Sequence, residues 1–163
     1  MKMTSVATTG IIAALAFLMM QLPSRAGSQS APPLAATTIP TAQLMQPEEL
    51  KLLLNGAAAN RPLILQVGSR IMYDQSHIPG SEFAGPGSRD EGLSLLRGRV
   101  KTLTRGGFIV LYCGCCPWSR CPNVGPAYKL LRDLGFSNVK VLYIADNFGT
   151  NWVDKGFSVE QNR

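Results

Sequence analysis

Short apolar runs alternate with helical patterns from residue 46 onward, and this alternation limits the folds that the chain can adopt. The apolar runs are rich in β-branched and aromatic residues, as in buried strands, and span 62–68, 108–112 and 138–144. Helices are expected at 46–56, 93–103, 126–136 and 151–157. Such an alternation predicts an α/β domain in which helices cover both faces of a parallel sheet.

The first 26 residues follow the pattern of a secretory signal peptide. Lys2 precedes an apolar run at 10–20, and a small-x-small cleavage pattern ends at Ala26. The run is shorter than the roughly 20 apolar residues of a membrane span, although an uncleaved N-terminal anchor is the alternative. We therefore expect cleavage near Ala26, a periplasmic or secreted protein, and no stable membrane insertion after cleavage.

The rest of the chain divides into a linker and one domain. Residues 27–44 are rich in Ala, Ser, Pro and Thr and carry no charge, which predicts a tether. Residues 45–163 are enough for one hydrophobic core and not for two. Within this domain, GPGSRDEG (85–92) has the composition of a surface loop.

The charge of the mature chain does not favour nucleic acid as a partner. The formal net charge is +6, and removal of residues 1–26 lowers it to about +4 because only basic residues are lost. A mild positive excess spread along the chain is typical of a soluble protein. We expect a monomer that binds no nucleic acid.

All four cysteines lie in one short stretch, YCGCCPWSRCPN (112–123). They are Cys113, Cys115, Cys116 and Cys121. Cys113 directly follows the apolar run at 108–112, and parallel α/β sheets bind ligands beyond the carboxyl ends of their strands. Unprotected thiols of an exported protein tend to pair. The stretch therefore predicts a nucleophile, a disulfide pair or a metal site.

Three motifs follow one another along the domain: YDQSHIPGS (73–81), FIVLYC (108–113) and NWVDKGFSV (151–159). Together they resemble the motifs of rhodanese-like domains, where the first of them is the signature Tyr-x-x-Gly-His-Ile-Pro-Gly-Ala. FIVLYC (108–113) puts Cys113 at the position of the family's sulfur-carrying cysteine. NWVDKGFSV (151–159) is similar to the closing Trp-x-x-x-Gly-Tyr-Pro-Val. The resemblance covers most of the domain and implies a rhodanese-like fold, with a parallel sheet between two layers of helices.

The resemblance also implies an activity, that of a rhodanese-type sulfurtransferase. The Cys113 thiolate would take sulfane sulfur from a small donor such as thiosulfate and hold it as a persulfide for a thiol or protein acceptor. Backbone N–H groups of Gly114, Cys115 and Cys116 would form an anion cradle, and Arg120 would be a helper cation. No cofactor is expected.

The chain departs from the family pattern in ways that bear on this activity. Gln66-Val67-Gly68 stands where the family usually has Asp-Val-Arg, so a carboxylate and its charge partner are lost. The loop after Cys113 is several residues longer than usual, and Pro117 and Pro122 donate no N–H group in it. A non-catalytic rhodanese-like binding module is therefore an alternative function.

The accessory thiols Cys115, Cys116 and Cys121 have no place in ordinary sulfur transfer. One of them could resolve a Cys113 persulfide into a disulfide, as in a thiol-disulfide redox protein. Because a Cys115–Cys116 bridge is strained, a bridge to Cys121 is the better pairing. All four cysteines could instead hold a soft metal, and their spacing suits Cu(I) better than zinc.

Two further residues of these motifs have structural interpretations. His77, the only histidine, is expected to hold its turn through a backbone hydrogen bond rather than to act as a metal ligand or base. Trp118 is expected to anchor the long loop on the domain, with a lid over the thiol as the alternative.

Overall fold

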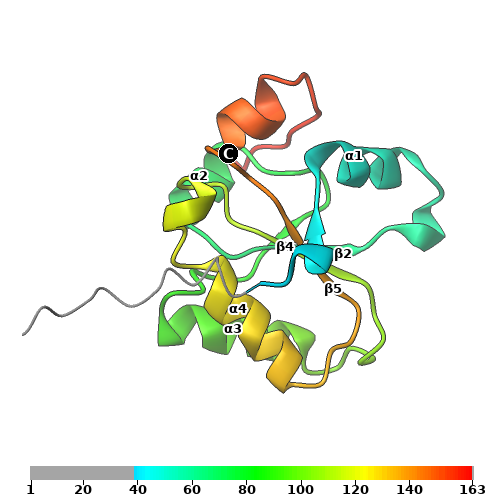
Figure 1. The fold of residues 1–163 in the computed structure, drawn as a ribbon, viewed down its shortest axis with the longest axis vertical. Coiled ribbons are helices and arrows are strands. Elements are labelled where there is room, and N and C mark those ends of the chain that lie inside the picture. Colours follow the sequence, from blue (N-terminus) through cyan, green and yellow to red (C-terminus); the bar gives the residue numbers. More distant parts are fainter. Residues whose placement is uncertain (1–38, 163) are drawn as a thin grey trace, which may run out of the picture. The chain divides into compact units, whose positions relative to one another are not determined.

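A computed structural model describes residues 39–162, so the expected signal peptide and most of the expected linker lie outside the described residues. Five parallel strands form one sheet in the order β1-β5-β4-β2-β3 (Figure 1). The strands are β1 (Leu44–Met45), β2 (Leu63–Gln66), β3 (Glu82–Phe83), β4 (Ile109–Tyr112) and β5 (Val139–Leu142). The predicted parallel α/β sheet is confirmed, and its three longer strands are the three predicted apolar runs.

Four α-helices and several short turns connect the strands. They are α1 (Pro47–Asn55), α2 (Arg70–Gln75), α3 (Asp90–Val100) and α4 (Val124–Asp133), with the short helical turns η2 (Thr41–Gln43), η3 (Ala58–Asn60), η4 (Trp118–Arg120) and η5 (Gly149–Val153). The four predicted helices correspond to α1, α3, α4 and η5. Helix α2 was not predicted, and α3 begins inside the segment expected to be a loop because Asp90 and Glu91 favour its positively polarised N-terminus.

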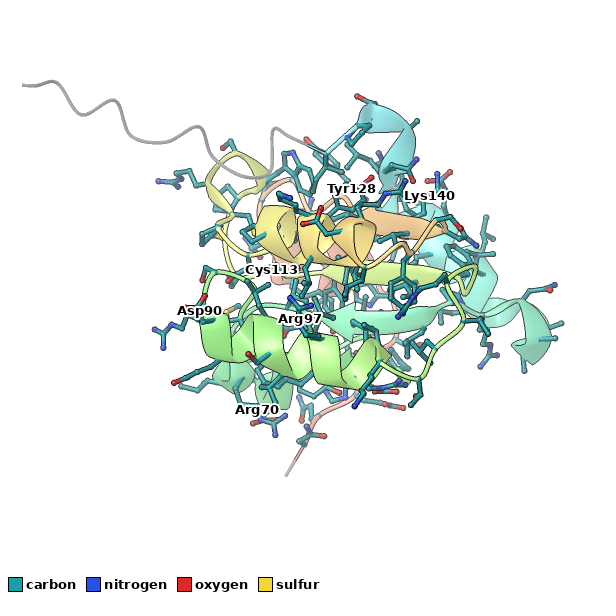
Figure 2. The ribbon with its side chains drawn as sticks, turned by 90° about the horizontal axis from the view of Figure 1, so that it is seen from below. Arg70, Asp90, Arg97, Cys113, Tyr128 and Lys140 are labelled. Atoms are coloured by element: carbon teal, nitrogen blue, oxygen red, sulfur yellow. The ribbon has the colours of Figure 1, made fainter. Side chains whose placement is uncertain are left out.

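The sheet separates two hydrophobic layers. Alternate residues of β4 point to opposite faces, so Leu111 packs with α3 and α4 while Val110 and Tyr112 pack with α1 and η5. Helices α3 and α4 lie side by side (Figure 1). Cys113 continues the alternation and belongs to the layer of α3 and α4, where Figure 2 labels it. This register determines which helices can surround its thiol.

The N-terminal end of the described chain is part of the domain. Ile39 is buried in the α3/α4 layer, and Leu44, the last residue of the expected linker, already pairs with Val141 of β5. Between residues 39 and 162, none of the helices is both long and apolar enough to cross a membrane.

Candidate functional site

The carboxyl ends of β2 and β4 lie next to each other and form the floor of the site. Gln66 pairs with Tyr112 in the sheet register, so the segment after β2 runs alongside Cys113. A Cβ atom on Gly68 would lie only 2.8 Å from Cys113 Sγ. The absence of a side chain at Gly68 therefore leaves room for the Cys113 thiol, and the Cβ atom of an arginine at this position would collide with it.

Gln66 replaces the expected carboxylate with a neutral amide that joins the two strand ends. Its side chain is almost fully buried. Nε2 donates to the Cys113 carbonyl oxygen at 3.3 Å, and Oε1 accepts from Gly68 N–H at 3.1 Å. The amide satisfies both strand ends without placing a negative charge beside the thiols.

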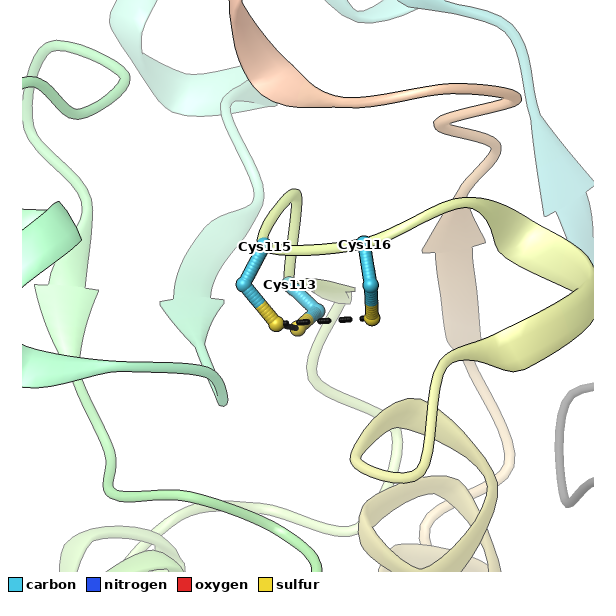
Figure 3. A group of neighbouring side chains, drawn as sticks. All are labelled: Cys113, Cys115 and Cys116. Atoms are coloured by element: carbon cyan, nitrogen blue, oxygen red, sulfur yellow. Dashed lines mark hydrogen bonds between the residues drawn. The ribbon is translucent and has the colours of Figure 1, made fainter.

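Three thiols meet directly beyond β4. Cys113 Sγ lies 2.9 Å from Cys115 Sγ, which lies 3.5 Å from Cys116 Sγ (Figure 3). Gly114 makes this possible, because its φ of 74° belongs to the left-handed region and a Cβ there would lie 2.8 Å from Phe148 Cβ. The chain thus reverses at Gly114 and brings Cys115 back over Cys113. All four cysteines are free thiols in this structure.

Asn123 is a further residue of the candidate site, and it was not predicted from the sequence. Its Nδ2 donates to Cys113 Sγ at 3.4 Å and points to Cys115 Sγ at 3.6 Å, while its Oδ1 accepts from Ser88 N–H at 3.1 Å. An asparagine before a helix ordinarily caps it, but this side chain makes no cap hydrogen bond with α4. The loop before α3 instead aims the amide at the two sulfurs.

The proton of Cys113 is shared with its neighbours. The pKa of Cys113 is raised because its thiol donates to Cys115 and Cys121 and because the residue is buried. Donation from Cys113, then from Cys116 and from the Cys115 backbone N–H, lowers the pKa of Cys115 to about 6. A thiol carries one proton, so Cys113 serves one acceptor at a time and the cluster titrates as a unit.

The other two thiols differ in their surroundings. Donation from Cys113 and from the backbone N–H groups of Asn123 and Val124, at the start of α4, lowers the pKa of Cys121 to about 6. Burial and the charge on Cys121 raise the pKa of Cys116 to about 12. Negative charge is therefore favoured on Cys115 or Cys121 and disfavoured on Cys113 and Cys116.

The residues of the expected anion cradle and the expected helper cation lie in the loop that follows Cys113. The backbone N–H of Cys115 supports the thiolate of Cys115 itself. Arg120 is exposed, and its side chain has no hydrogen bond or ion pair with another described residue. Trp118 is half-buried and packs against Tyr143 with ring centroids 5.2 Å apart, and its backbone N–H donates to the Ala145 carbonyl oxygen at 3.0 Å. It anchors the loop, as expected.

A cavity of about 150 Å³ gives access to Cys113. Its walls come from the ends of β2 and β4, from α2 and from η5, and include Met72, Gln75 and Phe148. Cys115 is not among the lining residues, and none of those that line it is charged. A larger cavity, of about 500 Å³, lies between α1 and the C-terminal segment and contains no thiol.

The YDQSHIPGS motif supports the site from the opposite face of the sheet. Ser81 Oγ lies 3.0 Å from the hydroxyl of Tyr112, which also accepts from Ile78 N–H at 3.3 Å. His77 Nδ1 lies 2.8 Å from the Tyr73 carbonyl oxygen, and the His77 backbone pairs with that of Glu160. The structural interpretation of His77 is confirmed, and the motif fixes the end of β4 just before Cys113.

The fold is that of rhodanese-like domains. The crystal structure of the Alr3790 protein of Anabaena sp. has 23% identity and a TM-score of 0.56, and the match covers 72% of this chain and 92% of that one. The solution structure of the rhodanese-like domain of Alr3790 has 22% identity and a TM-score of 0.52, and the match covers 73% of this chain and 79% of that one. A rhodanese-like domain protein of Staphylococcus aureus has 13% identity and a TM-score of 0.51, and the match covers 74% of this chain and 99% of that one.

One similar structure has an enzyme's name. The thiosulfate sulfurtransferase of Pseudomonas aeruginosa has 21% identity and a TM-score of 0.54, and the match covers 74% of this chain but 20% of that one. Neither a family model nor a curated protein matches the chain. At these identities the likeness establishes the rhodanese-like fold and does not by itself establish sulfur transfer.

Proposed function

We propose that this protein is a sulfurtransferase that carries sulfane sulfur as a persulfide on Cys113. One observation supports this most directly: Cys113 is the thiol that lines the 150 Å³ cavity, and the sulfur of Cys115 lies 2.9 Å from it. A donor in the cavity therefore meets Cys113, while a neighbouring thiolate is in place to accept the Cys113 proton.

The reaction follows from this arrangement. The proton of Cys113 passes to Cys115 or Cys121, and Cys113 Sγ attacks the outer sulfur of a donor R–S–SH. The S–S bond of the donor breaks, the thiol R–SH leaves with a proton from the cluster, and the outer sulfur stays on Cys113 as –S–SH. Asn123 Nδ2, 3.4 Å from Cys113 Sγ, stabilises negative charge on the sulfur.

The cavity favours one class of donor. Thiosulfate carries two negative charges and needs cations or several N–H donors, whereas the lining has uncharged side chains only. A small alkyl persulfide presents a hydrophobic body and one weakly acidic sulfur. We therefore propose that an alkyl persulfide loads Cys113 faster than thiosulfate does.

The test is mass spectrometry of the reduced, desalted protein under anaerobic conditions, before and after each donor. The expected result, in samples quenched at early times, is a gain of one sulfur atom on Cys113 that cyanide removes as thiocyanate. Cys113→Ser should abolish the gain, and Ser119→Ala, an exposed change in the same loop, should not. A gain that persists in Cys113→Ser would refute the assignment of the sulfur carrier.

A second candidate function is the binding of a soft metal. The sulfurs of Cys113, Cys115 and Cys116 all lie within 4.8 Å of one another, as in a trigonal thiolate site. Such a site suits Cu(I), which prefers few, soft ligands. If Cu(I) binds stoichiometrically and protects these thiols from alkylation while no donor loads Cys113, metal binding replaces sulfur transfer. If neither occurs, the site is a non-catalytic binding module.

A further inference from the structure

Sulfur transfer through Cys113 uses a neighbouring thiolate only as a proton acceptor, a role that Cys121 can also fill. Cys115 Sγ nevertheless lies 2.9 Å from Cys113 Sγ, nearer than the 3.5 Å between Cys115 Sγ and Cys116 Sγ. The two sulfurs are 2.9 Å apart, and the S–S bond of a disulfide is about 2.05 Å long, so a shift of about 1 Å would bring them to bonding distance. The backbone turn at Gly114 fixes this approach and requires glycine. The proximity is thus a consequence of the fold and not of a side-chain rotamer alone.

We propose that Cys115 resolves the Cys113 persulfide and releases its outer sulfur as hydrosulfide, so that the protein converts sulfane sulfur to sulfide. This inference rests on the proposed function. Cys115 Sγ attacks Cys113 Sγ, a Cys113–Cys115 bond forms, the bond from Cys113 Sγ to the outer sulfur breaks, and its electron pair leaves with HS⁻. The outer sulfur is reduced, the two cysteine sulfurs are oxidised to a disulfide, and no external oxidant takes part.

Cys115 is the best placed of the three accessory thiols. Its sulfur lies 2.9 Å from Cys113 Sγ, and its side chain is only partly buried, which leaves room for it to move toward Cys113. Cys121 is 3% exposed and is held at the start of α4 by two backbone N–H groups. Cys116 Sγ lies 3.5 Å from Cys115 Sγ and makes no hydrogen bond with Cys113 Sγ.

Asn123 connects the two reacting sulfurs. Its Nδ2 lies 3.4 Å from Cys113 Sγ and 3.6 Å from Cys115 Sγ, so one donor faces the sulfur that is attacked and the sulfur that attacks. The disulfide must be reduced before the next turnover. A thiol or dithiol must therefore reduce the Cys113–Cys115 disulfide. In an oxidising compartment this reductant would be a dedicated thiol-donating protein.

The experiment is a single anaerobic turnover without added reductant. Reduced protein is mixed with one equivalent of a small alkyl persulfide, sulfide is trapped with a fluorescent bimane, and the protein is mapped without reduction. The intact protein should release about one sulfide per chain and end with a Cys113–Cys115 disulfide. Cys115→Ser should keep the added sulfur on Cys113 and release sulfide at least about 10-fold more slowly.

Further variants separate the possible outcomes. Cys116→Ser should still release sulfide, and circular dichroism should show that each variant is folded. If the intact protein retains its persulfide as Cys115→Ser does, or if the disulfide joins Cys113 to Cys121, this inference is wrong while the proposed function stands. If the intact protein neither gains sulfur on Cys113 nor releases sulfide, the proposed function itself fails.

Discussion

Replacing Asn123 with aspartate tests whether this side chain supports the Cys115 thiolate. Aspartate has nearly the same shape, so one oxygen can still accept from Ser88 N–H, while the other takes the place of Nδ2, 3.6 Å from Cys115 Sγ. A donor is thereby exchanged for a negative charge, which disfavours the thiolate and raises the pKa of Cys115.

The magnitude follows from the distance. Two unit charges 3.6 Å apart interact by about 4.6 kcal/mol at an effective dielectric constant near 20, which corresponds to roughly 3 pKa units. Cys115 is half-exposed, so solvent screens much of this repulsion. We expect the pKa of Cys115 to rise by at least about 1 unit from its value of about 6.

The assay is the pH dependence of alkylation by iodoacetamide, with Cys115 identified by fragmentation of the labelled peptide. Because a thiol reacts as its thiolate, alkylation of the intact protein should be half-maximal at about pH 6 and decline below it. In Asn123→Asp the midpoint should lie at about pH 7 or above. Asn60→Asp adds the same charge at an exposed site and should leave the midpoint unchanged. An unchanged midpoint in Asn123→Asp would show that Asn123 does not face the thiolate.

Two other substitutions test the packing around Cys113. Gly68→Ala places a Cβ 2.8 Å from Cys113 Sγ, so it should slow persulfide loading about 10-fold and lower the free energy of unfolding by about 1–3 kcal/mol. The control is Gly106→Ala, whose added Cβ meets nothing within 4 Å. Equal loading in the two variants would contradict the crowding argument. Tyr112→Phe leaves the buried Ile78 N–H without its acceptor and should cost about 1–3 kcal/mol in urea denaturation with loading preserved. A Tyr112→Phe variant as stable as the intact protein would show that this hydrogen bond contributes nothing.

The sequence predicts the central part of the sheet because each of its strands carries its own signal. Strands β2, β4 and β5 are apolar apart from Gln66 and Lys140, and such runs are recognisable without any partner. Strands β1 and β3 have two residues each and exist only because they pair with β5 and β2. No local pattern marks a two-residue strand, so these edge strands could not be predicted.

The residues of the candidate site likewise differ in whether a local sequence pattern reveals them. Cys113 could be located because it follows a recognisable strand. Asn123 is ten positions further on, and its contact with Cys113 depends on the path of a loop whose length and prolines fit no standard turn. Arg120 was expected to be a helper cation for the thiols, but a side chain on a loop can point to solvent as easily as to a site, and this one is exposed.

The departures at this site are physically consistent with one another. An amide at Gln66 and the absence of a side chain at Gly68 remove both charges beside Cys113, and the S–H groups of the thiols, Asn123 Nδ2 and backbone N–H groups stabilise the thiolates instead. A thiol donates only while it is reduced. A disulfide between Cys113 and Cys115 therefore removes the nucleophile and the largest donor to Cys121 in a single step, which raises the pKa of Cys121. Proton sharing among the thiols therefore depends on the redox state of the site. A reductant that opens the disulfide restores both the nucleophile and the hydrogen-bond donor.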